Sequence, residues 1–171
     1  KHQWQVIKAI SALRTRGYKI TLKLVGGSTS AGENLVKNAI ENSHEKGSFV
    51  ERMEFVSHKE IPALLSESDL FIFASSCENM PVTLIEGMAI GLPIACSDRG
   101  PMPEVLGDGG VYFDPDDYLS IANTIERILS SSDLRSSISK EAKSLSLKYN
   151  WKQCSDDTFD YILSTYKNIN S

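Results

Sequence analysis

The chain has 171 residues, 41% of them hydrophobic and 23% charged, which is the composition of a soluble globular domain. A domain of this size buries enough surface to fold without disulfides or a structural metal. The net charge is −4, from 18 Lys and Arg against 22 Asp and Glu, and the basic residues form no run. This balance argues against nucleic acid as a partner and against an anionic membrane as the main partner.

The cysteines and the apolar segments indicate the cellular compartment in which the protein is expected. Cys77, Cys96 and Cys154 are odd in number and widely spaced, which favours neither a disulfide framework nor a zinc site. No apolar run approaches the length that spans a bilayer, and no charged and then apolar leader opens the chain. We therefore expect a cytoplasmic protein with no metal and no other cofactor.

Helical and strand patterns alternate through the first half. Apolar periodicity predicts helices over 2–14, 33–45 and 60–66, and strands over 19–25, 52–56 and 69–74. The last of these strands is apolar on both faces, as in a parallel sheet covered by helices on each side. The first helix begins without a capping residue, so we expect another domain to precede this chain.

The second half continues the alternation and then becomes helical. The pattern predicts helices over 82–90, 102–106, 118–129, 133–148 and 151–166, and strands over 93–96 and 111–113. Asp133 and Asn150 are placed as N-caps of the last two helices. The whole chain is thus expected to form one α/β domain, 1–171, with a doubly wound, Rossmann-like parallel sheet. Ligands of such sheets bind at the carboxyl ends of the strands.

A glycine-rich loop and the histidines carry weaker signals. The loop 27–32 has the glycine spacing of a P-loop, but Glu33 stands where a phosphate-binding Lys is required, so we interpret the loop as a polar turn. His2 and His44 are interpreted as solvated helix residues. His58 follows an expected strand, where it would line a pocket rather than act in catalysis.

Two glutamates flank the start of the 82–90 helix. Glu78 lies in the loop after a buried strand, and Glu86 lies on the helix itself. Glu33 and Glu41 have the same spacing, but they fall on one expected helix with no loop between them, which is typical of a solvated face. We therefore expect only Glu78 and Glu86 to face a ligand.

The start of this helix suits a diphosphate. An exposed helix N-terminus offers free backbone N–H groups, so the amides of Val82 and Thr83 could hold phosphates, and Pro81 suits the first turn. Ionised carboxylates accept hydrogen bonds from neighbouring hydroxyls, so Glu86 could hold a ribose and Glu78 a hexose. Together these groups describe a site for a nucleotide sugar.

Further motifs follow in a fixed order. The two glutamates are followed by Gly91-Leu92-Pro93, by the run 97–108 and by Asp114-Pro115. This set resembles the retaining glycosyltransferases of family 4, whose GT-B fold has two facing Rossmann-like domains. The resemblance implies that the chain is the C-terminal, donor-binding half of such an enzyme. Its N-terminal acceptor domain would lie outside this chain.

The resemblance also assigns roles to residues. Glu78 and Lys1 would be catalytic, with Glu78 on the donor hexose and Lys1 balancing charge on the departing diphosphate. Glu86 would bind the ribose, and the loop with Ser57 and His58 would face the base. A family Arg would lie before Lys1, outside this chain.

The phosphate and sugar contacts would come from the loop before the helix. The resemblance implies that the backbone N–H groups of Val82 and Thr83 bind the phosphates. Asn79-Met80-Pro81 stand where the family usually has Gly-Phe-Gly, so Pro81 removes a backbone N–H that would face the sugar. This departure bears on which hexose the donor carries.

The implied activity is metal-independent, retaining transfer of a hexose to a glycan or lipid-linked acceptor, in polysaccharide or glycoconjugate synthesis, at the inner face of the membrane. Asp114-Pro115-Asp116 matches a metal-clamp pattern, but we interpret it as a turn and helix cap. Two alternatives stay open, a sugar-nucleotide epimerase and a non-catalytic nucleotide-binding module. The resemblance further predicts that Trp151 and the last helix pack partly outside the sheet.

Overall fold

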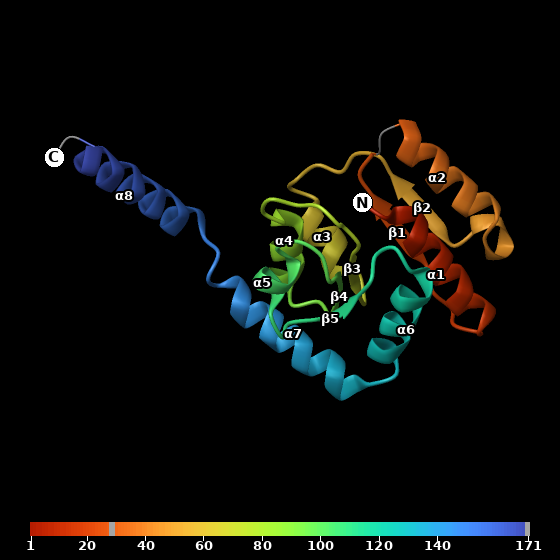
Figure 1. Ribbon diagram of the computed structural model, residues 1–171. Coiled ribbons are helices and arrows are strands. Elements are labelled where there is room, and N and C mark those ends of the chain that lie inside the picture. The colour runs from red at the N-terminus through yellow and green to blue at the C-terminus, as the bar shows by residue number, and fades with distance from the viewer. Residues whose placement is uncertain (28–29, 170–171) are drawn as a thin grey trace.

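Helices and strands alternate along most of the chain (Figure 1). The structure is a computed structural model and describes residues 1–27 and 30–169. In chain order the elements are α1 (Gln3–Thr15), β1 (Leu22–Val25), α2 (Ser30–Glu41), η1 (His44–Gly47), β2 (Val50–Met53), α3 (Ile61–Ser66), β3 (Phe71–Phe73), α4 (Val82–Ile90), β4 (Ile94–Ser97), α5 (Met102–Leu106), β5 (Val111–Phe113), α6 (Tyr118–Leu129), α7 (Ser132–Ser146) and α8 (Trp151–Ile169).

Every strand pair within residues 1–27 and 30–169 is parallel, which confirms the expected α/β class with helices around a parallel sheet. The strands form two groups, β1-β2 and β3-β4-β5, and among the described residues no ladder joins β1 to β3. A cavity of about 1940 Å³ extends between these two strands and is lined by residues of both. The expected sheet is therefore divided at the β1 and β3 edges.

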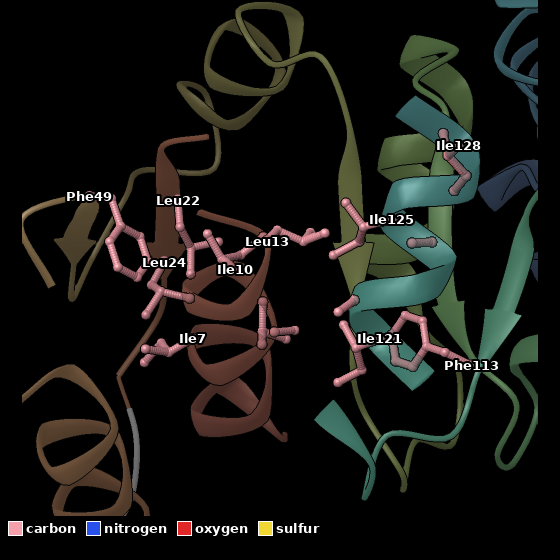
Figure 2. Close-up of a cluster of buried hydrophobic side chains, with 14 of the residues drawn as sticks. Ile7, Ile10, Leu13, Leu22, Leu24, Phe49, Phe113, Ile121, Ile125 and Ile128 are labelled. Carbon is pink, nitrogen blue, oxygen red and sulfur yellow. The ribbon is translucent and has the colours of Figure 1, made fainter. Parts of the chain in front are cut away.

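One hydrophobic core spans both groups of strands. Helices α1 and α6 pack against each other, and Figure 2 shows their side chains meeting between the two groups. The apolar positions recur every three or four residues on each helix, which places them on one face. The labelled members of this core are Ile7, Ile10, Leu13, Leu22, Leu24, Phe49, Phe113, Ile121, Ile125 and Ile128.

A second core lies on the other side of the three-stranded group. It gathers side chains from α4, α5 and α7 around β3 and β4, among them Leu84 and Met88 of α4. Gly87 lets α4 approach β3 closely, because a Cβ added there would lie 2.6 Å from Cδ1 of Phe71. Cys96 is buried in this core, where burial raises the pKa of its thiol to about 12, and all three cysteines are free.

Helix α8 extends away from the rest of the molecule (Figure 1). None of its described residues is buried, and Trp151 is 81% exposed. Trp151 therefore lies outside the core, as predicted, but the described part of α8 lies wholly rather than partly outside the sheet.

Several expected boundaries are wrong. The helix expected over 33–45 covers Ser30–Glu41. It cannot extend through Glu45 and Lys46, whose φ angles of 53° and 50° are not helical. Strand β2 lies earlier than the expected 52–56. Its apolar signal there came from residues such as Phe55, which is 86% exposed. The polar turn interpreted over 27–32 includes positions 28 and 29, which lie outside the described residues.

The predicted caps are partly confirmed. Asn150 accepts a hydrogen bond from the Gln153 N–H at 2.8 Å, as expected for an N-cap. Helix α7 is instead capped by Ser131, which accepts from the Leu134 N–H at 3.2 Å. Asp133 lies inside the first turn, where its charge complements the helix dipole.

Candidate functional site

The expected ligand residues gather where β2 and β3 end and α1 and α4 begin. The large cavity between β1 and β3 is lined by Lys1, His58, Val82, Thr83 and Glu86, among other residues. The other expected residues, Ser57, Glu78, Asn79, Met80 and Pro81, do not line the cavity and lie in the neighbouring loops.

The start of α4 is shaped by Pro81. This residue is the N-cap, one position before the first helical turn where it was expected, and its carbonyl accepts from the Leu84 N–H at 2.9 Å. The Val82 N–H donates to the Met80 carbonyl at 2.9 Å. In this state the Val82 amide is therefore engaged in the turn, and a phosphate would have to open that contact to use it.

Glu78 is paired with Lys1. The Lys1 Nζ lies 3.1 Å from the Glu78 Oε1, and it also lies 5.6 Å from the ring centroid of Phe73. Burial alone would raise the pKa of the Glu78 carboxyl, but the Ser75 hydroxyl and the Lys1 ammonium group outweigh it and lower that pKa. Glu78 is thus ionised at neutral pH and able to accept hydrogen bonds from sugar hydroxyls.

Glu86 is paired with His58. The Nδ1 of His58 lies 3.3 Å from the Glu86 Oε1, although the two residues come from the loop after β2 and from α4. The His58 side chain is 86% exposed, whereas Glu86 is largely covered at 26%. The fold therefore brings together the residues expected at the base and at the ribose.

His2 was interpreted as a solvated helix residue, and this is wrong. Its side chain is 12% exposed, and Nε2 lies 2.8 Å from the Ser76 Oγ. Its Nδ1 lies 3.3 Å from the Oδ1 of Asp116. Burial lowers the pKa of His2, and Asp116 opposes this shift. The local pattern held no signal, because both partners are distant in sequence.

Glu33 is also not the solvated residue expected. Its two carboxylate oxygens each accept from the Arg52 guanidinium at 2.8 Å, so the pair is bidentate and ties α2 to β2. The opposite charges of Glu33 and Arg52, on two elements that follow each other along the chain, could have predicted this ion pair. Glu41 is exposed, as expected.

The segment Asp114-Pro115-Asp116 is a turn, as interpreted. Asp114 Oδ1 accepts from the Asp116 N–H at 3.0 Å and from the Arg99 Nη2 at 2.9 Å. The hydrogen bond from Asp116 is the main cause that lowers the pKa of Asp114. Asp117 then caps α6 by accepting from the Leu119 N–H at 2.8 Å.

Comparison with known proteins identifies the family. Residues 1–145 match the family described as "Glycosyl transferases group 1". The chain belongs to this family. The family resemblance seen in the motifs is therefore confirmed, and the two glutamates lie inside the matched region.

Curated relatives of this group 1 glycosyltransferase chain are much longer. Spore coat protein SA of Bacillus subtilis is 32% identical over 154 residues, which are 82% of this chain and 39% of that protein. The O-antigen chain mannosyltransferase B of Escherichia coli is 23% identical over 128 residues, 75% of this chain and 33% of that protein. The chain thus spans well under half the length of these relatives.

Solved structures share the fold. The C-terminal domain of LpcC, a glycosyl transferase group 1 family protein of Francisella tularensis, superposes with a TM-score of 0.75 at 21% identity, covering 86% of this chain and 78% of that domain. HepE of Anabaena, in complex with UDP and glucose, gives 0.78 at 20% identity, covering 94% of this chain and 44% of that one. Within the described residues, no helix is long and apolar enough to cross a membrane.

Proposed function

We propose that this chain is the donor-binding domain of a retaining glycosyltransferase that uses a nucleoside diphosphate hexose. The observation that carries the proposal is the placement of two carboxylates, each with a cationic or titratable partner, around the start of one helix. The Lys1–Glu78 and His58–Glu86 pairs both flank α4 beside the large cavity. A nucleotide sugar carries a hexose, a diphosphate and a ribose in that order, which matches the order of Glu78, the start of α4 and Glu86.

Each residue has a role in the proposal. Glu86 accepts hydrogen bonds from the ribose, replacing its contact with His58, while Ser57 and His58 face the base. Thr83, with Val82 once its turn opens, presents backbone N–H groups to the phosphates. The loop 79–81 borders the hexose, which Glu78 binds.

The proposed chemistry depends on the leaving group. As the bond between the hexose and the diphosphate breaks, negative charge grows on the phosphate oxygens. The helix-end amides and the Lys1 ammonium stabilise that charge without reorganising, which lowers the barrier. Glu78 holds the hexose while positive charge develops at its anomeric carbon.

The acceptor and the setting extend the same proposal. An N-terminal domain outside this chain would supply the acceptor site, for a glycan or a lipid-linked sugar, at the cytoplasmic face of the membrane. The names of the Escherichia coli mannosyltransferase and of the Anabaena complex with UDP and glucose support a nucleotide sugar donor.

Calorimetric titration and a transfer assay on the isolated chain test the proposal. We expect weak binding of at least one of UDP and GDP, and no glycosyl transfer, because the acceptor site lies elsewhere. Absence of binding to either would contradict the donor role. Transfer by this chain alone would contradict the division of labour between two domains.

A further inference from the structure

His2 joins three segments beside the candidate site. Its backbone N–H donates to the Ala74 carbonyl, just after β3, at 2.8 Å. Its own carbonyl accepts from the N–H groups of Gln5 and Val6, at 3.0 and 3.2 Å, and so begins α1. The main chain at His2 therefore fixes the first turn of α1 against the end of β3.

The imidazole makes two further contacts. Nε2 lies 2.8 Å from the Ser76 Oγ, and Nδ1 lies 3.3 Å from the Oδ1 of Asp116. The second contact is electrostatic rather than a directed hydrogen bond. A neutral ring with its proton on Nδ1, toward the carboxylate, leaves Nε2 to accept from the Ser76 hydroxyl.

Asp116 is itself held in place. Its N–H donates to the Asp114 carboxylate, and its carbonyl accepts from the Gln5 side chain, which extends from α1. The ring of Trp4 packs against the imidazole at a tilt of 39°, with its centroid 5.1 Å from that of His2. The His2 side chain thus has fixed partners on the loop after β3 and on the turn before α6.

The residues that make these contacts lie close in sequence to the two proposed catalytic residues. Lys1 precedes His2, and Glu78 follows Ser76 by two positions. The Lys1 side chain is 62% exposed, and a long exposed ammonium group gains little order from one ion pair. The main chain that carries it is instead ordered through His2.

We propose that His2 is a positioning residue that holds Lys1 beside Glu78 by fixing the start of α1 to Ser76 and to Asp116. This inference rests on the proposed function, in which Lys1 stabilises the diphosphate. It assigns His2 an effect on phosphate binding that passes through Lys1 and needs no contact between His2 and the ligand.

A double-mutant cycle tests the route through Lys1. Calorimetry would measure the affinities of the wild-type chain, Lys1→Met, His2→Ala and the double variant for UDP, GDP and inorganic pyrophosphate. We expect Lys1→Met to weaken binding about tenfold, as for one charged hydrogen bond, and His2→Ala to weaken it by a smaller factor. In the Lys1→Met background, His2→Ala should have no further effect.

Two more variants separate positioning from folding. Ser76→Ala removes one partner of the ring from outside α1, and it should cause a loss of affinity that also disappears in the Lys1→Met background. His2→Gln can reach the Ser76 hydroxyl from the position of Nε2, and it should restore most of the affinity. His44→Ala is the matched control, because His44 lies in η1 and does not line the cavity. This substitution should leave the affinities for all three probes unchanged.

The outcomes distinguish the two proposals. Wild-type binding to none of the three probes would overturn the proposed function itself. If Lys1→Met weakens binding but the His2 and Ser76 variants do not, only the positioning role fails. Equal losses from His2→Ala with and without Lys1, alongside a lower melting temperature, would show that His2 acts through stability and would overturn the inference.

Discussion

The roles proposed for the two glutamates differ, and substitution separates them. If Glu86 binds the ribose, Glu86→Ala should weaken binding of the nucleoside diphosphate and of the nucleotide sugar alike, by about 1.5 to 3 kcal/mol. Glu78→Ala should lower the affinity for the complete donor without lowering that for the nucleoside diphosphate, because Glu78 contacts only the hexose. Calorimetry with UDP or GDP and the matching sugar conjugate measures both.

The control for this pair is Glu41→Ala. Glu41 is exposed on α2 and should leave both affinities unchanged, whereas Glu33 is unsuitable because it pairs with Arg52. Equal effects of the Glu78 and Glu86 substitutions on both ligands would contradict the division of roles.

The Lys1–Glu78 contact predicts a pH dependence of stability. The folded-state pKa of Glu78 is lowered from 4.5, so its ionised form stabilises the fold at neutral pH, and this contribution is lost as pH falls below 4.5 and through the folded-state value. Glu78→Gln should therefore be less stable than wild type at pH 7. The difference in free energy of unfolding, measured with urea, should shrink on acidification to pH 3. A difference that stays constant with pH would contradict the prediction.

At the scale of elements, the contact between α4 and β3 sets the position of Glu86. A Cβ at Gly87 would meet the ring of Phe71, at 2.6 Å from Cδ1, so Gly87→Ala should destabilise the fold by about 1 to 3 kcal/mol. It should also weaken nucleotide binding, because α4 carries Glu86. Thermal unfolding and calorimetry would measure the two effects.

Gly27→Ala is the stability control for this substitution. A Cβ at Gly27 would meet nothing within 4 Å, so the melting temperature should not fall. An unchanged melting temperature for Gly87→Ala would mean that the ring of Phe71 moves aside freely and that the close approach is not required.

Element types could be predicted from the sequence wherever apolar periodicity was strong. Helix α6 has the expected bounds, because its apolar residues recur on one face. Helix α4 is apolar almost throughout, but it also has the expected bounds, because Gly91 ends it. Strand β2 was misplaced because Phe55 contributes strand propensity but lies exposed. The placement of Glu78 and Glu86 around α4 followed from loop and helix order. The burial of His2 did not, since Ser76 and Asp116 reach it only through tertiary packing.

At the scale of the whole molecule, α8 contributes little to the folded core. None of its described residues is buried, so removing residues 150–171 should leave the melting temperature within about 2 °C of that of the full chain. Its exposed apolar side chains are Trp151, Phe159, Tyr161, Ile162, Leu163, Tyr166 and Ile169.

A longer deletion is the counterpart to this truncation. Removing residues 131–171 also deletes α7, which buries Ile138 and Ala142 against the two cores, and the remainder should lose cooperative unfolding. A large fall in melting temperature from the shorter deletion would show that α8 supports the fold.

The sheet is divided into two groups of strands that share one hydrophobic core, and the large cavity is lined by both β1 and β3. His58 follows β2 of the two-stranded group, and Glu86 lies on α4, which packs against the three-stranded group. A ligand that contacts both residues would therefore crosslink the two groups of strands. Ligand binding and the rigidity of the domain would then be thermodynamically coupled, so that anything that stiffens the domain would also strengthen binding.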